Sequence, residues 1–83
     1  MLKIYGTDLC QDCLDCKEEL DRKGKAYVFL DINKSLSVLK EFLALRDKYD
    51  VFIKVKEQGL IGIPTLLFDD GLVSLDWQVY AKK

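Results

Sequence analysis

The sequence predicts a single α/β domain over residues 1–83, and three observations support that expectation. The chain has 83 residues, which is the size of one domain and leaves no room for a second. Hydrophobic residues make up 49% and charged residues 33%, as in a folded soluble protein. Short runs rich in β-branched and aromatic residues alternate with longer segments whose apolar residues recur every three or four positions.

The first half of the chain is expected to form a strand, a helix and a second strand. Residues 2–5 are an apolar run typical of a strand, and residues 26–32 are a second run rich in aromatic and β-branched side chains. Between them we expect a helix over residues 14–23, with Gly24 as its terminator. Short connections of this kind indicate parallel strands joined by a right-handed crossover. One face of the helix carries apolar residues at spacings of four, three and four: Leu9, Cys13, Cys16 and Leu20.

The second half of the chain is expected to begin with two helices. Ser35 is a favourable N-cap for a helix over residues 36–48, whose apolar residues form one stripe. Asp50 is placed to cap a further short helix that ends at Gly59. This short helix is an extra element before the third strand.

A hairpin and a last helix complete the expected fold. Residues 65–68 and 72–75 have strand-like composition, and Asp70-Gly71 between them is a hairpin turn signal. Asp76 is placed to cap a short final helix. The predicted order is therefore strand, helix, strand, helix, strand, strand, helix, with the extra short helix before the third strand.

The composition narrows the possible functions. The net charge of −1 gives no basic surface for nucleic acid, and the absence of histidine excludes Cys–His and Ser–His catalysis and histidine metal ligation. The longest apolar run, residues 60–68, is far shorter than the ~20 residues of a membrane span. The N-terminus offers no secretory signal. We therefore expect a cytoplasmic monomer that binds neither nucleic acid nor membranes.

The most distinctive stretch of the chain is Cys10-Gln11-Asp12-Cys13. It lies between an expected strand and an expected helix, where a Cys-x-x-Cys pair is typical of a redox motif. The N–H groups at a helix N-terminus lack intrahelical partners, and together with the helix dipole they favour the thiolate form of Cys10. Asp8 and Asp12 oppose this effect. Cys13 follows one helical turn later and is placed to attack a mixed disulfide at Cys10.

The element order and two motifs resemble those of the glutaredoxin family. The motifs are the Cys-x-x-Cys pair of Cys10 and Cys13 and the sequence Ile63-Pro64-Thr65, which opens the third strand. The resemblance covers essentially the whole chain and implies a thioredoxin-like fold, with a four-stranded mixed sheet and helices on both faces. It also implies that Pro64 is cis and faces the dithiol, and that Ile63 pairs with the substrate backbone.

Together the resemblance and the chemistry predict a thiol–disulfide oxidoreductase. Cys10 is the expected nucleophile and Cys13 the resolving thiol, so these two residues form the catalytic pair. The expected substrate is a disulfide in a protein or a small molecule, and the reaction needs no metal and no tightly bound organic cofactor. Five residues are expected to bind the substrate: Gln11, Asp12, Ile63, Pro64 and Thr65.

The sequence leaves the electron donor open between glutathione and a reductase protein. Glutaredoxins carry a Gly-Gly pair after the hairpin that admits the γ-glutamyl group of glutathione, whereas residues 73–76 here are Val-Ser-Leu-Asp. The family also has Pro-Tyr or Pro-Phe between the cysteines, where this chain has Gln11-Asp12. Glutathione is therefore less favoured as the reductant here than in the family.

Cys16 has two interpretations. It is either a small apolar residue packed beneath the helix, because free cysteine is commonly buried, or a third functional thiol. As a functional thiol it takes the disulfide from Cys13 or serves as a ligand in a Cys-x-x-Cys-x-x-Cys run. The alternative function is therefore an iron–sulfur or metal carrier that uses Cys10, Cys13 and Cys16. A third possibility is an interaction domain that keeps the fold without redox activity.

Overall fold

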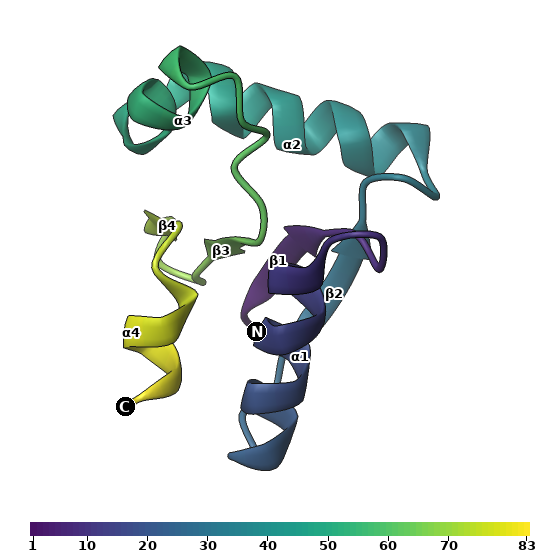
Figure 1. The fold of residues 1–83 in the computed structure, drawn as a ribbon, viewed down its shortest axis with the longest axis vertical. Helices are drawn as coiled ribbons and strands as arrows, with labels where there is room; N and C mark the ends of the chain where they lie inside the picture. Colours follow the sequence, from purple (N-terminus) through teal and green to yellow (C-terminus); the bar gives the residue numbers. More distant parts are fainter.

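The computed structural model describes residues 1–83 and contains a four-stranded sheet with helices on both faces (Figure 1). The elements follow the order predicted from the sequence, including the additional short helix before the third strand. A 3-10 turn, Asp50–Phe52, leads directly into that helix. In chain order the strands and helices are β1 (Lys3–Gly6), α1 (Gln11–Arg22), β2 (Val28–Asp31), α2 (Leu36–Lys48), α3 (Ile53–Glu57), β3 (Thr65–Leu67), β4 (Val73–Ser74) and α4 (Trp77–Ala81).

The sheet is mixed and has the strand order β2-β1-β3-β4. β1 and β2 run parallel, as expected for strands joined by a helical crossover, and the β1–β3 and β3–β4 pairs are antiparallel. The register of β1 and β3 places Ile4 opposite Leu66 and Tyr5 opposite Thr65. The end of β1 therefore lies beside the start of β3, and the loops attached to these two ends come together.

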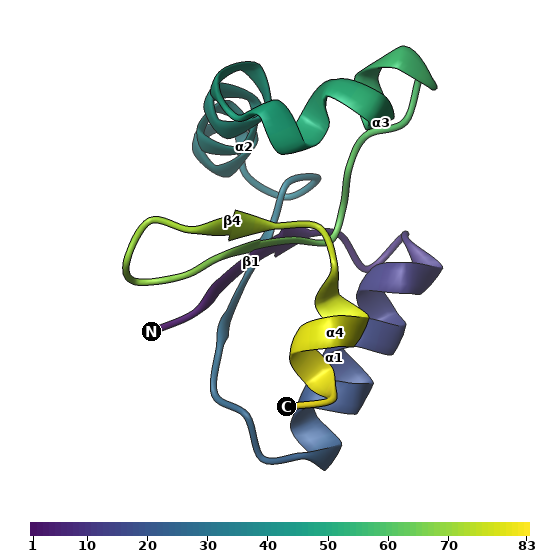
Figure 2. The same cartoon turned by 90° about the vertical axis from the view of Figure 1, so that its left-hand side faces the viewer.

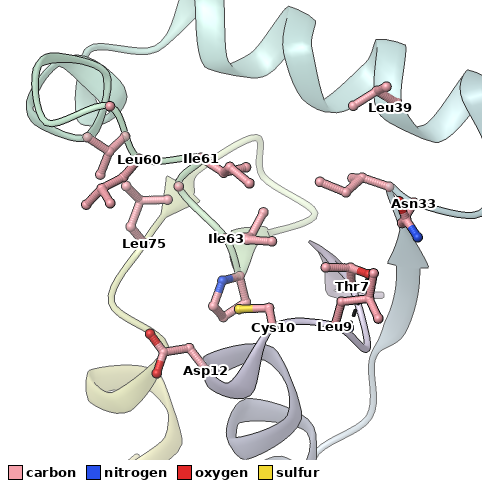
Figure 3. A pocket seen from close by; sticks show the side chains of 15 residues that line it. Thr7, Leu9, Cys10, Asp12, Asn33, Leu39, Leu60, Ile61, Ile63 and Leu75 are labelled. Atoms are coloured by element: carbon pink, nitrogen blue, oxygen red, sulfur yellow. Dashed lines mark hydrogen bonds between the residues drawn. The ribbon is translucent and has the colours of Figure 1, made fainter.

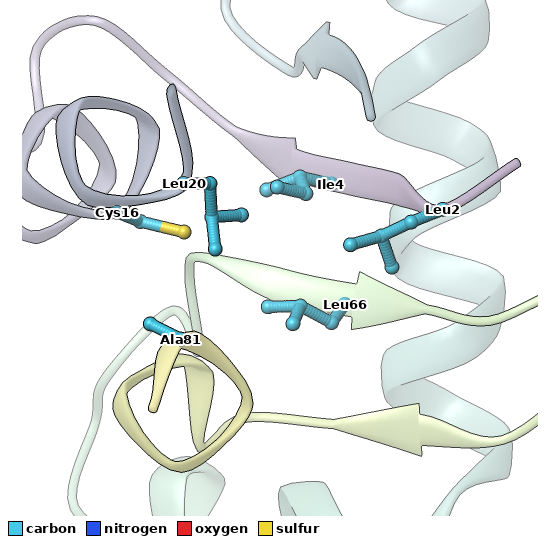
Figure 4. Packing of buried hydrophobic residues seen from close by; sticks show 6 residues of the cluster. All are labelled: Leu2, Ile4, Cys16, Leu20, Leu66 and Ala81. Atoms are coloured by element: carbon cyan, nitrogen blue, oxygen red, sulfur yellow. The ribbon is translucent and has the colours of Figure 1, made fainter. Parts of the chain in front are cut away.

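Helices cover both faces of the sheet (Figure 2). α1 and α4 lie on one face, which we call the closed face, and α2 and α3 lie on the other, which we call the open face. α1 packs directly against α4. Figure 4 shows the buried core of the closed face, which consists of Leu2, Ile4, Cys16, Leu20, Leu66 and Ala81.

The core of the open face is mainly aromatic. Tyr5 of β1 packs against Phe42 of α2 with ring centroids 6.3 Å apart, and Phe42 packs edge-on against Phe52 at 6.0 Å. The Tyr5 hydroxyl donates a hydrogen bond to Glu41 (3.0 Å), so its polar end is satisfied. These contacts hold α2 and the 3-10 turn against the sheet.

Local sequence signals explain where two helix ends fall. The Ser35 hydroxyl accepts a hydrogen bond from the Val38 N–H (3.3 Å), so α2 begins after Ser35 as predicted. Gly24 follows α1 with a φ of +68°, a conformation that suits glycine, and the next N–H, of Lys25, donates to the Leu20 carbonyl (2.9 Å). The prediction that Gly24 terminates this helix is confirmed.

The structure corrects three predictions at other helix ends. α1 begins at Gln11 rather than at residue 14, because the Leu14 N–H already donates to the Cys10 carbonyl (3.1 Å). The prediction that Cys10 lies at the start of this helix is confirmed. Asp50 lies inside the 3-10 turn rather than at its N-cap. Asp76 occupies the N-cap position of α4, but its side chain makes no capping hydrogen bond. The short helices α3 and α4 therefore begin without a side-chain cap.

β2, β3 and β4 are shorter than predicted, whereas β1 has the predicted length and lies one residue later in the chain. β2 covers Val28–Asp31 rather than residues 26–32, and β4 is reduced to Val73–Ser74. The hairpin turn lies where it was expected, since the Leu72 N–H donates to the Asp70 carboxylate (3.0 Å). No helix of the chain combines the length and the apolar character that crossing a membrane requires.

Candidate functional site

Cys10 lies at the junction between the β1–α1 loop and α1. It occupies the N-cap position of α1 with an extended backbone (φ −107°, ψ 122°), and its N–H donates to the Thr7 carbonyl (3.1 Å). Its side chain makes no capping hydrogen bond and is partly exposed. The Cys10 sulfur therefore lies at the positive end of the helix and remains accessible from a groove, as Figure 3 shows.

Cys13 lies one helical turn further along α1 and is fully buried, at 0% exposure. Its sulfur packs against β1 at Gly6, where an added Cβ would lie 2.7 Å from the sulfur. Burial raises the pKa of Cys13 to about 12, although the Thr7 backbone N–H lowers it, and the neighbouring Cys10 thiol raises it further. Cys13 is therefore a protonated thiol at neutral pH, and it interacts with both Cys10 and the Thr7 backbone.

Cys16 faces away from the groove and packs in the core of the closed face (Figure 4). It is fully buried, and burial raises the pKa of Cys16 to about 11. This position agrees with the interpretation of Cys16 as a packed core residue. No group of three histidine, cysteine, aspartate or glutamate side chains is arranged to hold a metal ion, so the metal-carrier alternative has no preformed site.

A groove of about 800 Å³ opens beside Cys10 (Figure 3). Three of the predicted substrate-binding residues line it: Asp12, Ile63 and Pro64. The Ile63–Pro64 peptide bond is cis, as the resemblance implied. Cys10 and Pro64 are distant in the sequence, and they share this groove because the end of β1 lies beside the start of β3.

The other two predicted substrate-binding residues, Gln11 and Thr65, do not line the groove. The Gln11 side-chain amide donates to the Asp15 carboxylate (2.8 Å) on the exposed face of α1. Thr65 is fully buried, and its hydroxyl donates to the Gly62 carbonyl (2.6 Å). Thr65 therefore supports the loop that carries Pro64 and contributes no surface to the groove.

One wall of the groove consists of apolar residues that the sequence analysis did not single out. Leu60 and Ile61 form this wall and are 52% and 55% exposed. Leu9, which the sequence analysis placed on the apolar face of the helix, instead precedes α1, lies on the side of Cys10 and is 80% exposed. Arg46 of α2 holds the wall, because its guanidinium donates to the Ile61 carbonyl (2.9 Å) and to the Leu60 carbonyl (2.6 Å). The sequence signal that could have revealed this wall is the apolar run directly before Pro64.

Gly6 is a second site residue whose role the sequence did not reveal. A side chain at this position would meet the Cys13 sulfur at 2.7 Å and the Phe29 ring at 3.2 Å. Glycine therefore allows the buried thiol to lie directly against the central strand. The residue type alone suggested only a break between strand and loop.

Asp8, in the loop before Cys10, forms ion pairs with two lysines from other parts of the chain. Its carboxylate pairs with Lys17 (2.8 Å) and Lys34 (3.3 Å), and these bonds hold the pKa of Asp8 below its usual range. Both lysines thus lie beside the Asp8 carboxylate, at the loop that leads to Cys10. Asp12 is the one acidic or basic side chain that lines the groove.

The site is thus a partly exposed cysteine at a helix N-terminus, with a second, buried thiol behind it and an apolar groove in front. No protein-family model matches the sequence, and no solved structure matches the chain. The chain is 40% identical over 73 residues to an uncharacterized protein from Haemophilus influenzae, and the match covers 88% of this chain and 85% of that protein. The chain belongs to the same family as that protein.

Proposed function

We propose that this chain is a thiol–disulfide oxidoreductase with a thioredoxin-like fold of the glutaredoxin type. The observation that carries the proposal is the pairing of Cys10, partly exposed at the start of α1, with Cys13, buried one turn behind it. A nucleophilic thiol must be accessible to the substrate, whereas a resolving thiol must be close to the nucleophile and shielded from other reactants. The different exposure of the two thiols matches these two requirements.

In the proposed reaction the dithiol transfers two electrons to a disulfide. The Cys10 thiolate attacks one sulfur of the substrate, which forms a mixed disulfide and releases the other sulfur as a thiolate that takes up a proton. Cys13 then attacks the Cys10 sulfur, and its proton passes to the substrate sulfur that leaves. This step releases the second substrate thiol and leaves a Cys10–Cys13 disulfide, so the substrate is reduced and the protein is oxidised.

The surroundings of the two thiols suit these steps. Cys10 occupies the N-cap of α1, where the N–H groups of the first turn lack intrahelical partners and the positive end of the helix dipole lies beside the attacking sulfur. The raised pKa of Cys13 keeps it protonated until the mixed disulfide has formed, so it does not compete with Cys10 for the first attack. The Thr7 N–H interacts with the Cys13 sulfur and is placed to stabilise the thiolate as it attacks.

The position of Pro64 and the β1–β3 arrangement further support a glutaredoxin-like oxidoreductase. Pro64 is cis and lines the same groove as Cys10, together with Ile63, which we assign to substrate binding. The reaction requires no metal and no bound organic cofactor. We propose that the protein is a cytoplasmic monomer, reduced by glutathione or by a reductase protein, because thiols stay reduced in the cytosol.

The test is reduction of hydroxyethyl disulfide, a small neutral substrate, by the prereduced protein. Cys10→Ser is expected to lower the rate to the background, and Cys13→Ser is expected to accumulate a mixed disulfide visible by mass spectrometry. Cys16→Ala serves as the matched control and is expected to keep the reaction, because its thiol lies in the core. Turnover with glutathione and with a reductase protein, measured in parallel, identifies the electron donor.

Three outcomes would contradict the proposal. Full activity of Cys10→Ser would show that the nucleophile is misassigned. Failure of Cys10 and Cys13 to form a disulfide under mild oxidation would favour an interaction domain without redox activity. Visible absorbance of anaerobically purified protein, lost in Cys16→Ala, would instead support the metal or iron–sulfur carrier.

A further inference from the structure

The groove beside Cys10 has an unusual balance of apolar and charged groups. Nine of its fifteen lining residues are hydrophobic, and none is a lysine or an arginine. Asp12 contributes the one carboxylate. The groove therefore offers apolar surface and a single negative charge, and it offers no cation to a ligand that carries carboxylates.

The apolar wall is exposed to solvent where a ligand would lie. Leu60 and Ile61 each expose about half of their surface (52% and 55%), and Leu9 exposes 80%. Figure 3 shows Leu60 and Ile61 on the wall opposite Cys10. A ligand that covers these side chains removes apolar surface from water, which favours binding by ligands with apolar side chains of their own.

The wall is also preformed. Arg46 donates hydrogen bonds to the carbonyls of Leu60 and Ile61, at 2.6 and 2.9 Å, and the Thr65 hydroxyl donates to the Gly62 carbonyl at 2.6 Å. These carbonyls are therefore already paired, and the wall presents mainly the apolar side chains to a ligand. Arg46 reaches the wall from α2 and does not line the groove, so its charge is not offered to the ligand.

The nearby lysines are also occupied. Lys17 and Lys34 pair with Asp8, and Lys34 also approaches Asp31 at 3.9 Å. Neither lysine lines the groove. Oxidised glutathione has a net negative charge at neutral pH, so it would meet Asp12 without a compensating cation.

We propose that this groove selects protein disulfides whose cysteine is flanked by an apolar residue and a basic residue, and that it discriminates against anionic small disulfides such as oxidised glutathione. The apolar residue packs on Leu60 and Ile61, and the basic residue faces Asp12. The inference rests on the proposed oxidoreductase function and names the substrate class of that same site.

The experiment is a single-turnover reaction of the prereduced protein with matched disulfides. The protein dithiol supplies both electrons, so no other reductant is present. The substrates are symmetric disulfides of the capped peptides Leu-Cys-Lys, Leu-Cys-Glu and Ser-Cys-Lys, with oxidised glutathione and hydroxyethyl disulfide as references. We expect Leu-Cys-Lys to react about tenfold faster than Ser-Cys-Lys, since burying a leucine side chain is strongly favourable. It should also react about two- to fivefold faster than Leu-Cys-Glu, because its lysine can pair with Asp12 and an exposed ion pair stabilises a complex only slightly.

Variants assign each preference to a residue. Asp12→Lys is expected to make Leu-Cys-Glu react faster than Leu-Cys-Lys. The matched control Asp47→Lys, on the exposed surface of α2, should leave the order of the two rates unchanged. Leu60→Ser is expected to reduce the advantage of the leucine peptide, whereas Leu72→Ser, at a similarly exposed leucine outside the groove, should not. High salt should weaken the charge preference and leave the apolar preference in place.

The outcomes separate the inference from the proposed function. Equal rates for all peptides, or faster reaction with oxidised glutathione, would overturn the inference while Cys10-dependent reduction of hydroxyethyl disulfide still supported an oxidoreductase. Absence of Cys10-dependent reduction of every substrate would overturn the proposed function itself. Circular dichroism of each variant verifies that a changed rate does not result from unfolding.

Discussion

The two faces of the sheet differ in how completely their helices cover them. On the closed face, α1 and α4 bury a core whose six residues are 0–7% exposed. On the open face, α2 and α3 bury an aromatic core but leave a groove of about 800 Å³ that extends to Cys10. The start of α1 lies where these two environments meet, so Cys10 reaches the groove while Cys13 is enclosed by the closed face.

This difference shows how one short helix can give two thiols different roles. Cys10 and Cys13 are one turn apart, yet one is partly exposed and the other is not exposed at all. The closed face provides a tightly packed support, in which Cys13 lies against Gly6. The open face provides accessible surface for a partner. Four predictions test this contrast, in order of decreasing expected effect.

The largest expected contrast is between a leucine of the closed face and a leucine of the groove. Leu20→Ala should lower the free energy of unfolding by about 2–5 kcal/mol, because Leu20 is fully buried and its truncation leaves a cavity. Leu60→Ala should change it by no more than about 0.5 kcal/mol, because Leu60 is 52% exposed. Urea denaturation measures both values, and similar losses for the two variants would contradict the contrast.

The second prediction concerns the contact between Gly6 and Cys13. Gly6→Ala should lower the free energy of unfolding by about 1–3 kcal/mol, since the new Cβ would lie 2.7 Å from the Cys13 sulfur. The same substitution should cost less in a Cys13→Ala background, where the sulfur is absent. Urea denaturation of the wild type, the two single variants and the double variant gives the coupling free energy between Gly6 and Cys13. An equal cost of Gly6→Ala in both backgrounds would contradict the proposed close packing.

The third prediction uses the pH dependence of stability. The folded protein holds the pKa of Cys16 at about 11 and that of Cys13 at about 12, both above the ordinary value of 9.0. The folded state therefore keeps protons that the unfolded chain releases, and the free energy of unfolding should fall as the pH rises from about 9 toward 12. Tyr5 and Tyr27, whose pKa values are raised from 10.0 to about 12, add to this fall at higher pH.

Urea midpoints measured across this pH range test the third prediction. Cys16→Ala is the control, because it removes one of the titrating thiols from the closed face. In this variant the free energy of unfolding should decrease less steeply with rising pH. Stability that stays constant, or rises, above pH 9 would contradict the burial of these thiols.

The smallest expected effect concerns the open face. Arg46→Ala removes both hydrogen bonds to the groove wall and should raise the KM for peptide disulfides a few-fold, while kcat and the reduction of hydroxyethyl disulfide stay nearly constant. Arg46→Lys keeps the charge and should recover part of the effect. Lys40→Ala, on the exposed surface of the same helix, is the matched control. A loss of kcat without a change in KM would contradict a role in holding the wall.

Several features of the fold and the site were predictable because they depend on neighbouring residues. The Ser35 cap, the Gly24 terminator and the Asp70-Gly71 turn are each formed within a few positions of the chain. The Cys-x-x-Cys spacing likewise sets Cys10 and Cys13 one helical turn apart. The predictions for Asp50 and Asp76 were wrong because a residue type that can cap a helix does so only where the backbone directs its side chain to the first N–H groups.

Other features depended on contacts between distant segments. Arg46 and the Leu60–Ile61 wall, like Asp8 and its two lysine partners, are brought together by packing that no local pattern records. For the same reason the sequence assigned Thr65 to the substrate, although the structure buries it behind the loop.

The sequence by itself determined the elements, their order and the spacing of the cysteines, because backbone hydrogen bonding and helix periodicity act over a few residues. Only the tertiary structure decided that Cys10 faces a groove, that Cys16 faces a core, and that Pro64 shares the groove with Cys10. These arrangements follow from the register of β1 against β3 and from which face of the sheet each helix covers. Both are set by the burial of apolar surface over the whole chain.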